Sequence, residues 1–346
     1  MMNRNVLAKF VIASEAKQSS LYRRLDCFVA SLLAMTAVVA AFAAIPARAD
    51  TLKIAIPQKG AWDTSFSVYG DRQGFFKEQN ITLDITYTEG GATTETAVVS
   101  GSVDVAVATG TLGIISAYVK GAPVRIISAE STGSADLYWY AKAGVGIKSL
   151  KDLKGGKTIG FSAPGSSSNL SLLTLLKEQN VDAKPVPSGG MPPTFTQVMS
   201  GQLNAGWAAA PFGVLDLDQG KIFKIASAND SKDVANETIR VNVANLNTLQ
   251  QHRDLIVRFM KAYVKSYQWA YDNPKAIDYL AQDNNLPHEA AEKTVKGFLT
   301  KAANDPFHFS GIQRVLDEAL AAKRIPKAMK EDDVKGVFDI VWKPGQ

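Results

Sequence analysis

A glycine followed by three serines, Gly165-Ser166-Ser167-Ser168, is the clearest candidate for a chemical role in this sequence. The apolar segment 158–161 before it predicts a strand, and the spacing after it predicts a helix. The first N–H groups of a helix lack partners within the helix and lie at the positive end of its dipole, so they attract anions. We therefore predict that these four residues contact an anionic ligand. Ordinary helix capping by serine is the alternative.

Two further strand-to-helix corners present similar groups. Thr109 and Gly110 follow the predicted strand 103–108, and Gly91 begins a helical pattern after the predicted strand 81–87. Ligands in open α/β sheets bind beyond the carboxyl ends of the strands, so we predict that these three residues contact the ligand. Capping and turn formation are the alternatives. The Gly91 corner lacks the lysine of a phosphate-binding loop, which argues against a nucleotide.

Two residues outside these corners are also predicted to reach the ligand. Trp62 lies in the loop after the first predicted strand, where its large ring could supply apolar contact with one polar group, and core packing is the alternative. Pro211 follows an apolar strand and is predicted to lie at the edge of the site. Trp207 lies within that strand and is expected in the core.

The sequence offers no group of residues suited to making or breaking bonds. His252, His288 and His308 lack the spacing of metal ligands, and no G-x-S-x-G nucleophile motif occurs. Cys27, the single cysteine, precedes the main body of the chain, so disulfides and thiol chemistry are not expected there. We expect no catalytic residue, no metal and no cofactor.

The elements that position these residues follow an α/β pattern. With 46% hydrophobic and 21% charged residues, the chain can build sizeable cores, which excludes global disorder. From residue 51, short apolar segments alternate with helical spacing, which is typical of βαβ units on a largely parallel sheet. A second block of the same kind precedes a mostly helical tail. Helices are predicted at 68–79, 254–271, 275–283, 288–302, 311–322 and 330–341.

The first 49 residues are predicted to be a signal peptide. Basic residues precede the apolar run 28–45, and Ala47-Arg48-Ala49 fits a cleavage site after Ala49. A run of this length is also at the lower limit for a membrane anchor, which is the alternative. Without the leader, 32 basic and 31 acidic residues remain, so charge gives no reason to expect binding to nucleic acid or anionic lipid. The predicted location is the periplasm.

Several short stretches follow one another in a characteristic order along the body. The most diagnostic are 147–155, IKSLKDLKG, and the serine turn at 165–168. The others are GFFKEQNI (74–81), SGSVDVA (100–106), KGAPV (120–124), GQLNA (201–205) and APF (210–212). Together they resemble the nitrate/sulfonate/taurine-type and thiamine-precursor-type solute-binding proteins of ABC importers.

This resemblance implies a two-lobed type II periplasmic-binding-protein fold of the α/β class. Two hinge crossovers are expected near 138–143 and 235–243. The expected division is a signal peptide at 1–49, the first part of lobe I at 50–139, lobe II at 140–237, and a mostly helical return to lobe I at 238–346.

The resemblance also implies a receptor that captures a small organic anion, sulfonate-like or related, between the lobes and delivers it to an ABC permease in the inner membrane. We expect a monomer that binds a small molecule and no nucleic acid. A periplasmic sensor is one alternative. An enzyme on the same fold, pyrimidine-synthase-like or desulfinase-like, is another, and the cysteine-free body argues against it. Amino-acid-binding relatives carry an arginine where this chain has Phe161-Ser162-Ala163, which argues against an amino acid.

Overall fold

The computed structural model describes residues 49–345. Strands and helices alternate through this part of the chain, so the predicted α/β class is confirmed. The apolar run 28–45 and most of the predicted signal peptide lie outside the described residues. Among residues 49–345, no helix is both long and apolar enough to cross a membrane.

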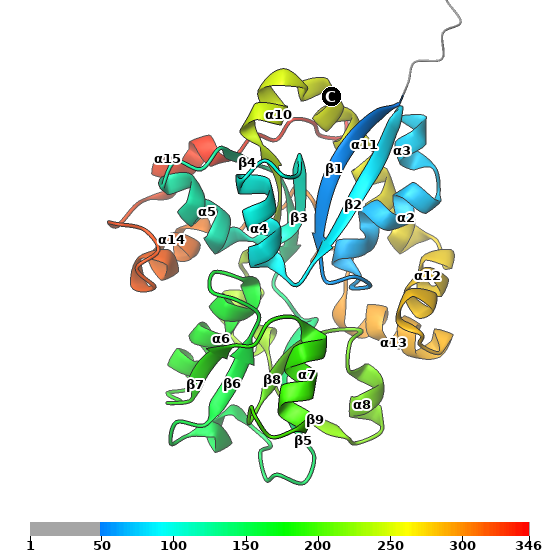
Figure 1. Ribbon diagram of the computed structural model, residues 1–346. Helices are drawn as coiled ribbons and strands as arrows, with labels where there is room; N and C mark the ends of the chain where they lie inside the picture. Colours follow the sequence, from blue (N-terminus) through cyan, green and yellow to red (C-terminus); the bar gives the residue numbers. More distant parts are fainter. Residues whose placement is uncertain (1–48, 346) are drawn as a thin grey trace, which may run out of the picture. The chain divides into compact units, whose positions relative to one another are not determined.

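Five strands form one mixed sheet, shown at the top of Figure 1. In spatial order they are β2 (Ile81–Thr88), β1 (Asp50–Pro57), β3 (Val105–Gly110), β10 (Thr238–Asn245) and β4 (Val124–Thr132). The pairs of β1 with β2 and with β3 are parallel, as the strand–helix alternation predicts. β10 comes from a distant part of the chain and runs antiparallel to both β3 and β4. Because β3 and β10 are buried along their whole length, every residue there is apolar or finds a polar partner.

We call the five-stranded sheet and the helices around it the first half of the structure. Its helices pack on the sheet and on one another. Their bounds are η1 (Asp63–Ser65), α2 (Phe66–Arg72), α3 (Phe75–Glu78), α4 (Gly91–Val99) and α5 (Thr111–Val119). α4 contacts β1 and β3, and α5 contacts β10. The single helix predicted at 68–79 is two helices, because Gly74 has φ +79° and ends the first one. Only glycine adopts this left-handed conformation without a steric cost.

The second half of the structure, residues 137–235, contains two smaller sheets. An antiparallel sheet has the order β8 (Gly206–Ala209), β5 (Leu137–Lys142), β9 (Ile222–Ser227), and a parallel pair joins β6 (Thr158–Phe161) to β7 (Lys184–Pro187). Ile159 and Ala205 bridge the two sheets, and the Trp139 indole donates a hydrogen bond of 3.0 Å to the Gly160 carbonyl. The helices here are η2 (Leu150–Leu153), α6 (Ser167–Glu178), α7 (Met191–Met199), α8 (Val214–Asp218), η3 (Ala228–Asp230) and α9 (Lys232–Ala235).

Helix α7 begins within Gly189-Gly190-Met191-Pro192-Pro193, a stretch whose glycines and prolines predict a loop by local rules. The two prolines lie in its first turn. Backbone N–H groups in the first turn of a helix have no partner within the helix, so prolines, which lack this group, do not interrupt it. β7 and β9 are also absent from the prediction, since β7 carries two prolines and β9 exposes two successive residues, Phe223 and Lys224, which breaks the alternation of a strand.

The chain then returns to the first sheet through seven further helical segments. These are α10 (Leu246–Gln251), α11 (Arg253–Asp272), α12 (Lys275–Asn284), α13 (His288–Phe298), α14 (Ile312–Ala321), α15 (Glu331–Val334) and η4 (Lys335–Val337). The helix predicted at 254–271 is confirmed as α11, which packs against α2 and α3. The helices predicted at 288–302 and 330–341 end earlier, at Phe298 and Val337. The lobe boundaries expected from the sequence remain a prediction.

The return brings Arg314 of α14 against a buried carboxyl. Its guanidinium contacts Glu237, at 3.1 Å, and Asp233 on α9. Burial raises the pKa of Glu237 to about 7, although Arg314 acts in the opposite direction. The Glu237 carboxyl therefore holds its proton more firmly in the folded state than in the unfolded chain.

Replacing Trp139 should show how far its burial holds the second half together. The residue is fully buried and hydrogen-bonded, so Trp139→Ala is expected to lower the free energy of unfolding by about 3–5 kcal/mol, measured by urea denaturation. Phe223→Ala on the neighbouring strand β9 is the control. Its ring is 47% exposed, and the expected change is within about 0.5 kcal/mol. Equal effects of the two variants would contradict the assigned role of Trp139.

Glu237 predicts a pH dependence of stability. Since its folded pKa lies above the unfolded value of 4.5, the free energy of unfolding should fall as pH rises through 4.5 to about 7. The change from this one group is of the order of 3 kcal/mol. Glu237→Gln should make stability less sensitive to pH, as measured by urea unfolding at about pH 5 and about pH 8. Glu289→Gln, an exposed position on α13, should behave like the wild type.

Candidate functional site

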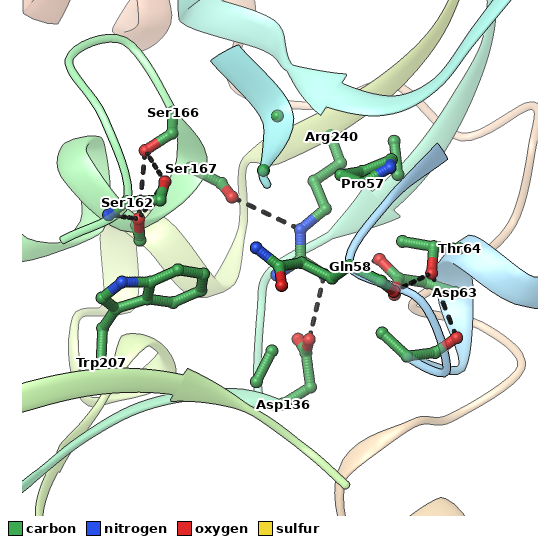
Figure 2. Close-up of a pocket in the computed structure, with 16 residues that line it drawn as sticks. Pro57, Gln58, Asp63, Thr64, Asp136, Ser162, Ser166, Ser167, Trp207 and Arg240 are labelled. Atoms are coloured by element: carbon green, nitrogen blue, oxygen red, sulfur yellow. Dashed lines mark hydrogen bonds and ion pairs between the residues drawn. The ribbon is translucent and has the colours of Figure 1, made fainter. Parts of the chain in front are cut away.

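A cavity of about 40 Å³ lies between residues of the first half and residues of the second. Figure 2 shows serines from the turn before α6 on one side, Asp63 and Thr64 on the other, and Arg240 reaching in between. The lining residues are Pro57, Gln58, Ala61, Asp63, Thr64, Gly90, Gly91, Ala108, Asp136, Ser162, Ser166, Ser167, Ser168, Trp207, Ala209 and Arg240.

The serine side of the cavity is built on the N-terminus of α6. Ser166 is the N-cap, and its hydroxyl accepts a hydrogen bond of 3.2 Å from the Asn169 N–H. The hydroxyls of Ser162, Ser166 and Ser168 lie 2.8–3.0 Å from one another and form a closed triangle. The Ser162 N–H donates to the Ser168 hydroxyl at 3.0 Å. These three side chains therefore fix the turn by bonding to one another.

Ser167 differs from its neighbours because its side chain stays outside the triangle. Its oxygen accepts a long contact of 3.5 Å from Arg240 Nε. Within residues 49–345, the backbone N–H groups of Ser167 and Ser168 have no hydrogen-bond acceptor. They are the first two N–H groups of α6, so they combine unpaired donors with the positive end of a twelve-residue helix.

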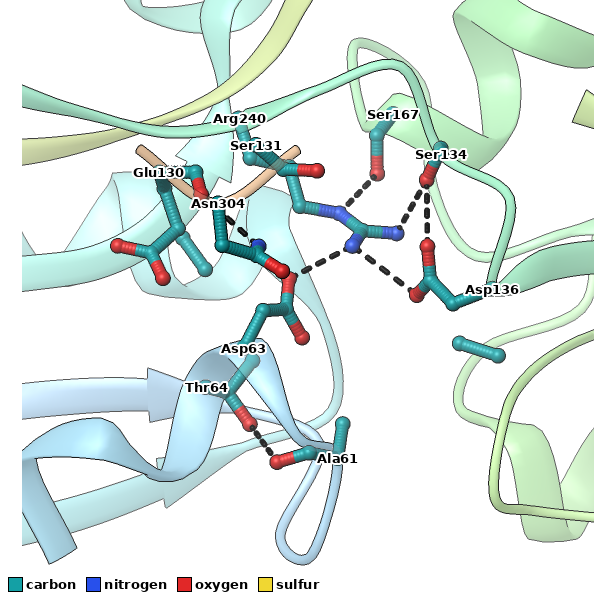
Figure 3. A network of polar contacts seen from close by, with 12 residues as sticks. Ala61, Asp63, Thr64, Glu130, Ser131, Ser134, Asp136, Ser167, Arg240 and Asn304 are labelled. Carbon is teal, nitrogen blue, oxygen red and sulfur yellow. Dashed lines mark hydrogen bonds and ion pairs between the residues drawn. The ribbon is translucent and has the colours of Figure 1, made fainter. Parts of the chain in front are cut away.

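The opposite side of the cavity is an ion triad. Arg240 on β10 donates through one nitrogen, Nη1, to Asp63 at 2.6 Å and to Asp136 at 3.1 Å (Figure 3). Its Nη2 donates to the Ser134 hydroxyl at 2.8 Å, and Ser134 in turn donates to Asp136 at 3.0 Å. The three charged residues are 2%, 3% and 7% exposed, so solvent screens them little.

Burial governs the electrostatics of this triad. Burial raises the pKa of Asp63 and Arg240 lowers it, while the neighbouring Asp136 raises it again, and the net direction is upward. For Arg240, burial alone would lower the pKa, but Asp136 and Asp63 outweigh it and raise the pKa. The guanidinium therefore stays charged between two carboxyl groups.

A second buried polar network lies behind Asp63. The Tyr263 hydroxyl and the Asn242 amide both donate to one oxygen of Glu130, the Asn242 contact being 2.5 Å. The other Glu130 oxygen is buried and has no partner among the described residues. Burial, with Asp63 adding to it, raises the pKa of Glu130 well above its usual value. This network joins β4, β10 and α11 beneath the site.

Four of the nine predicted site residues line the cavity, namely Gly91, Ser166, Ser167 and Ser168. Gly165 does not. Its φ of +89° forms the turn, and a side chain there would meet Arg324. Pro211 also lies outside the lining, after the end of β8.

Thr109 and Gly110, which are predicted to contact the ligand, do not line this cavity. The Thr109 hydroxyl is buried and donates to the Val241 carbonyl at 3.1 Å. Gly110 packs against the serine turn so closely that a Cβ there would lie 2.8 Å from the Gly165 oxygen. Thr109 and Gly110 therefore lie where the two halves are in contact. Ala108, directly before them, lines the cavity instead.

Trp207 lies in the hydrophobic core as predicted and also lines the cavity, whereas Trp62 lies in the core alone. Trp62 is fully buried among Phe66, Tyr69 and Tyr271 and does not line the cavity. Trp207 does line it, and its indole donates to the Gly189 carbonyl at 3.1 Å. The apolar context of Trp207 is the same for a core strand and for a cavity wall, so the sequence could not separate them.

The sequence analysis missed the charged half of the site. Asp63, Asp136 and Arg240 are 73 or more residues apart, so no local spacing connects them. One signal was present in the predicted crossovers. Arg240 lies inside the crossover near 235–243, and Asp136 lies two residues before the crossover near 138–143. No group of histidine, cysteine and acidic residues suited to a metal ion occurs in the described part of the chain.

Solved structures with the same fold identify the class. The alkanesulfonate-binding protein SsuA from Xanthomonas axonopodis pv. citri, bound to MOPS, superposes with a TM-score of 0.68 at 18% identity, covering 82% of this chain and 97% of that one. The Candida albicans CA3427 gene product, described as having the generic periplasmic binding protein fold, gives 0.66 at 17% identity and covers 83% and 94%. The nitrate-binding protein NrtA from Synechocystis PCC 6803 gives 0.64 at 14% and covers 83% and 84%. This chain therefore has the periplasmic-binding-protein fold.

The family follows from the sequence itself. A family model described as NMT1/THI5 like matches residues 63–277, and the chain belongs to this family. No curated protein matches the chain. The matched range includes Asp63, the serine turn and Arg240, so both sides of the cavity lie within the family region.

The triad predicts a large cost for removing its cation. Arg240→Met would leave two buried carboxylates without a counter-ion, so the free energy of unfolding should fall by about 3–5 kcal/mol in urea denaturation. Adding Asp63→Asn and Asp136→Asn to this variant should recover much of the loss, since no unpaired charge remains. A single Arg240→Met change that leaves stability within about 1 kcal/mol of wild type would contradict this account.

Proposed function

We propose that this protein is the extracytoplasmic solute-binding component of an ABC importer. It captures a small organic acid, sulfonate-like or related, between two lobes and delivers it to a permease in the inner membrane. The observation that carries the proposal is the N-terminus of α6, whose first two N–H groups find no acceptor among residues 49–345 and belong to residues that line a cavity between both halves of the structure.

The acid group of the ligand would be held at this helix end. The dipole of a helix favours a negative charge at its N-terminus by about 0.3–1 kcal/mol at the surface and up to about 2 kcal/mol when partly buried. Ser167 adds a hydroxyl without a formal charge, which favours reversible binding. The cavity lining contains no histidine or cysteine beside the serine triangle, so these hydroxyls support binding more than catalysis.

Capture would require the two halves to separate and close again. The cavity of about 40 Å³ has room for a few waters, each needing about 10–15 Å³, so an organic acid needs additional space. Lobe closure around a ligand is a common way to bury it and to create the shape that a partner recognises. The predicted signal peptide and its cleavage after Ala49 supply the export step, and the monomer is the proposed state.

A panel of sulfonates and carboxylates tests the ligand class by thermal shift. A ligand present at about 100 times its Kd stabilises the folded state by about 2.7 kcal/mol, which raises the melting temperature measurably. We expect at least one organic acid of the panel to stabilise the protein. A panel without any stabilising acid, confirmed by calorimetry, would contradict the proposed ligand class.

Ser167→Ala then tests the location of the site. A hydrogen bond to a charged group contributes about 1.5–3 kcal/mol, so the Kd for the acid found should rise about tenfold or more in isothermal titration calorimetry. Stability should change little, because Ser166 and not Ser167 caps the helix. Ser171→Ala, on the same helix and outside the cavity lining, should keep the wild-type affinity. Unchanged binding by Ser167→Ala would move the site elsewhere.

A further inference from the structure

We propose that a second cavity of this protein binds a short aliphatic carboxylate, with Arg324 holding the acid group. The second cavity has a volume of about 260 Å³ and lies between α5 and the end of α14 in the first half and the start of α6 in the second half (Figure 1). It shares no lining residue with the cavity described above. Its volume is close to the lower limit of about 300 Å³ for ligand pockets.

The unbalanced charge of Arg324 is the first argument. Glu318 and Arg324 are the ionisable residues among those that line the second cavity, and the Glu318 carboxyl already pairs with Arg314 at 3.3 Å. Arg324 forms no ion pair within residues 49–345, and its buried Nε has no hydrogen-bond partner there. A buried donor without an acceptor is costly, and a carboxylate could accept two parallel hydrogen bonds from the planar guanidinium group.

Gly165 fixes the position of this guanidinium group. A Cβ on Gly165 would lie 2.7 Å from Nη2, 3.1 Å from Cζ and 3.4 Å from Nη1 of Arg324, so the guanidinium group packs directly on the backbone of the serine turn. The donors of a guanidinium group point outward in its plane, and packing against its face does not use them. Asn169 adds a further donor to the lining, because its Oδ1 accepts from the Gly165 N–H at 3.0 Å and leaves its Nδ2 for a ligand.

Glu95 on α4 compensates Arg324 only in part. Burial raises the pKa of Glu95 to about 7, although Arg324 and Lys120 act in the opposite direction. Near neutral pH the Glu95 carboxyl is therefore protonated in a large share of the molecules, and its negative charge is then absent. An acid bound in the second cavity would supply the missing charge.

The remaining wall of the second cavity determines what the acid carries. Leu112 of α5 and Leu170 and Leu173 of α6 line it, and Leu173 is 37% exposed. Water beside such side chains finds few hydrogen-bond partners, so an apolar chain would displace it favourably. An inorganic anion would leave these leucines in contact with water. The lining therefore favours a carboxylate with an aliphatic chain.

Calorimetry with butanoate, hexanoate and hexanamide tests the ligand class on the exported protein. Hexanoate should bind about tenfold more tightly than butanoate, because it buries two more methylene groups. Hexanamide has a chain of the same length without the charge, and it should bind at least about tenfold more weakly than hexanoate. If Arg324 only supports the serine turn, hexanoate will not bind at millimolar concentration, and that result would overturn the inference.

Variants of Arg324 test the position of the acid group. Arg324→Gln should raise the Kd for hexanoate at least about tenfold, and Arg324→Lys should give an intermediate value, since it keeps the charge and loses the planar pair of donors. Urea unfolding establishes that both variants are folded. Lys327→Gln removes an exposed positive charge outside the lining and should keep the wild-type Kd. An unchanged Kd in Arg324→Gln would contradict the assignment.

A matched pair of leucines tests the apolar wall. Leu173 and Leu320 are 37% and 36% exposed, and of the two only Leu173 lines the second cavity. Leu173→Asn should reduce the preference for hexanoate over butanoate, whereas Leu320→Asn should retain it. Equal preferences in the two variants would show that the chain does not lie along α6.

The two cavities are separated by comparing Arg324→Gln with Ser167→Ala. Ser167 lines the first cavity and not the second, so Ser167→Ala should bind hexanoate like the wild type. Weaker hexanoate binding in Ser167→Ala, with unchanged binding in Arg324→Gln, would place the acid in the first cavity. That result would overturn this inference and leave the proposed function intact. Conversely, a failure of the sulfonate and carboxylate panel at the first cavity would not alter the results expected for Arg324 and Leu173.

Discussion

The contact of Arg240 with Asp63 and Asp136 is the interaction on which the site depends. It joins β10 of the large sheet to the segment after β1 and to the segment that leads into β5. Burying an ion costs several kcal/mol, and only good geometry with further hydrogen bonds offsets that cost. Ser134 supplies such a bond to both Arg240 and Asp136. The segments that connect the two halves are therefore held in place by the charged residues that line the cavity.

The same constraint explains why the cavity has two unlike sides. On the acidic side, the carboxyl groups are satisfied by a cation that comes from the protein itself. On the serine side, three hydroxyls satisfy one another, and the first two N–H groups of α6 remain unpaired. Arg240 touches both sides through different nitrogen atoms. A ligand bound as proposed would therefore compete with Arg240 on the acidic side and would meet the N–H groups of α6 on the serine side.

The sequence predicts the parts of this structure that local patterns determine. Strand–helix alternation and apolar periodicity are properties of neighbouring residues, so the α/β class, most strands and helix α11 could be predicted. The serine turn is local too. The antiparallel entry of β10, the ion triad and the positions of Trp62 and Trp207 depend on contacts between distant segments, which spacing does not encode. Gly74 and the prolines of α7 misled the prediction through local rules applied without tertiary context.

The solved structures show a similar difference between the fold, which they share with this chain, and the residues of the cavity lining. Proteins at 14–18% identity share the fold with this chain, so the arrangement of sheets persists although most residues differ. A lining with three buried charged residues is more sensitive to substitution, because an unpaired buried charge is costly. Fold similarity at this level therefore establishes the arrangement of the sheets, and the charges of the cavity lining come from Asp63, Asp136 and Arg240 of this chain. The fold itself is compatible with different ligands, since SsuA is an alkanesulfonate-binding protein and NrtA is a nitrate-binding protein.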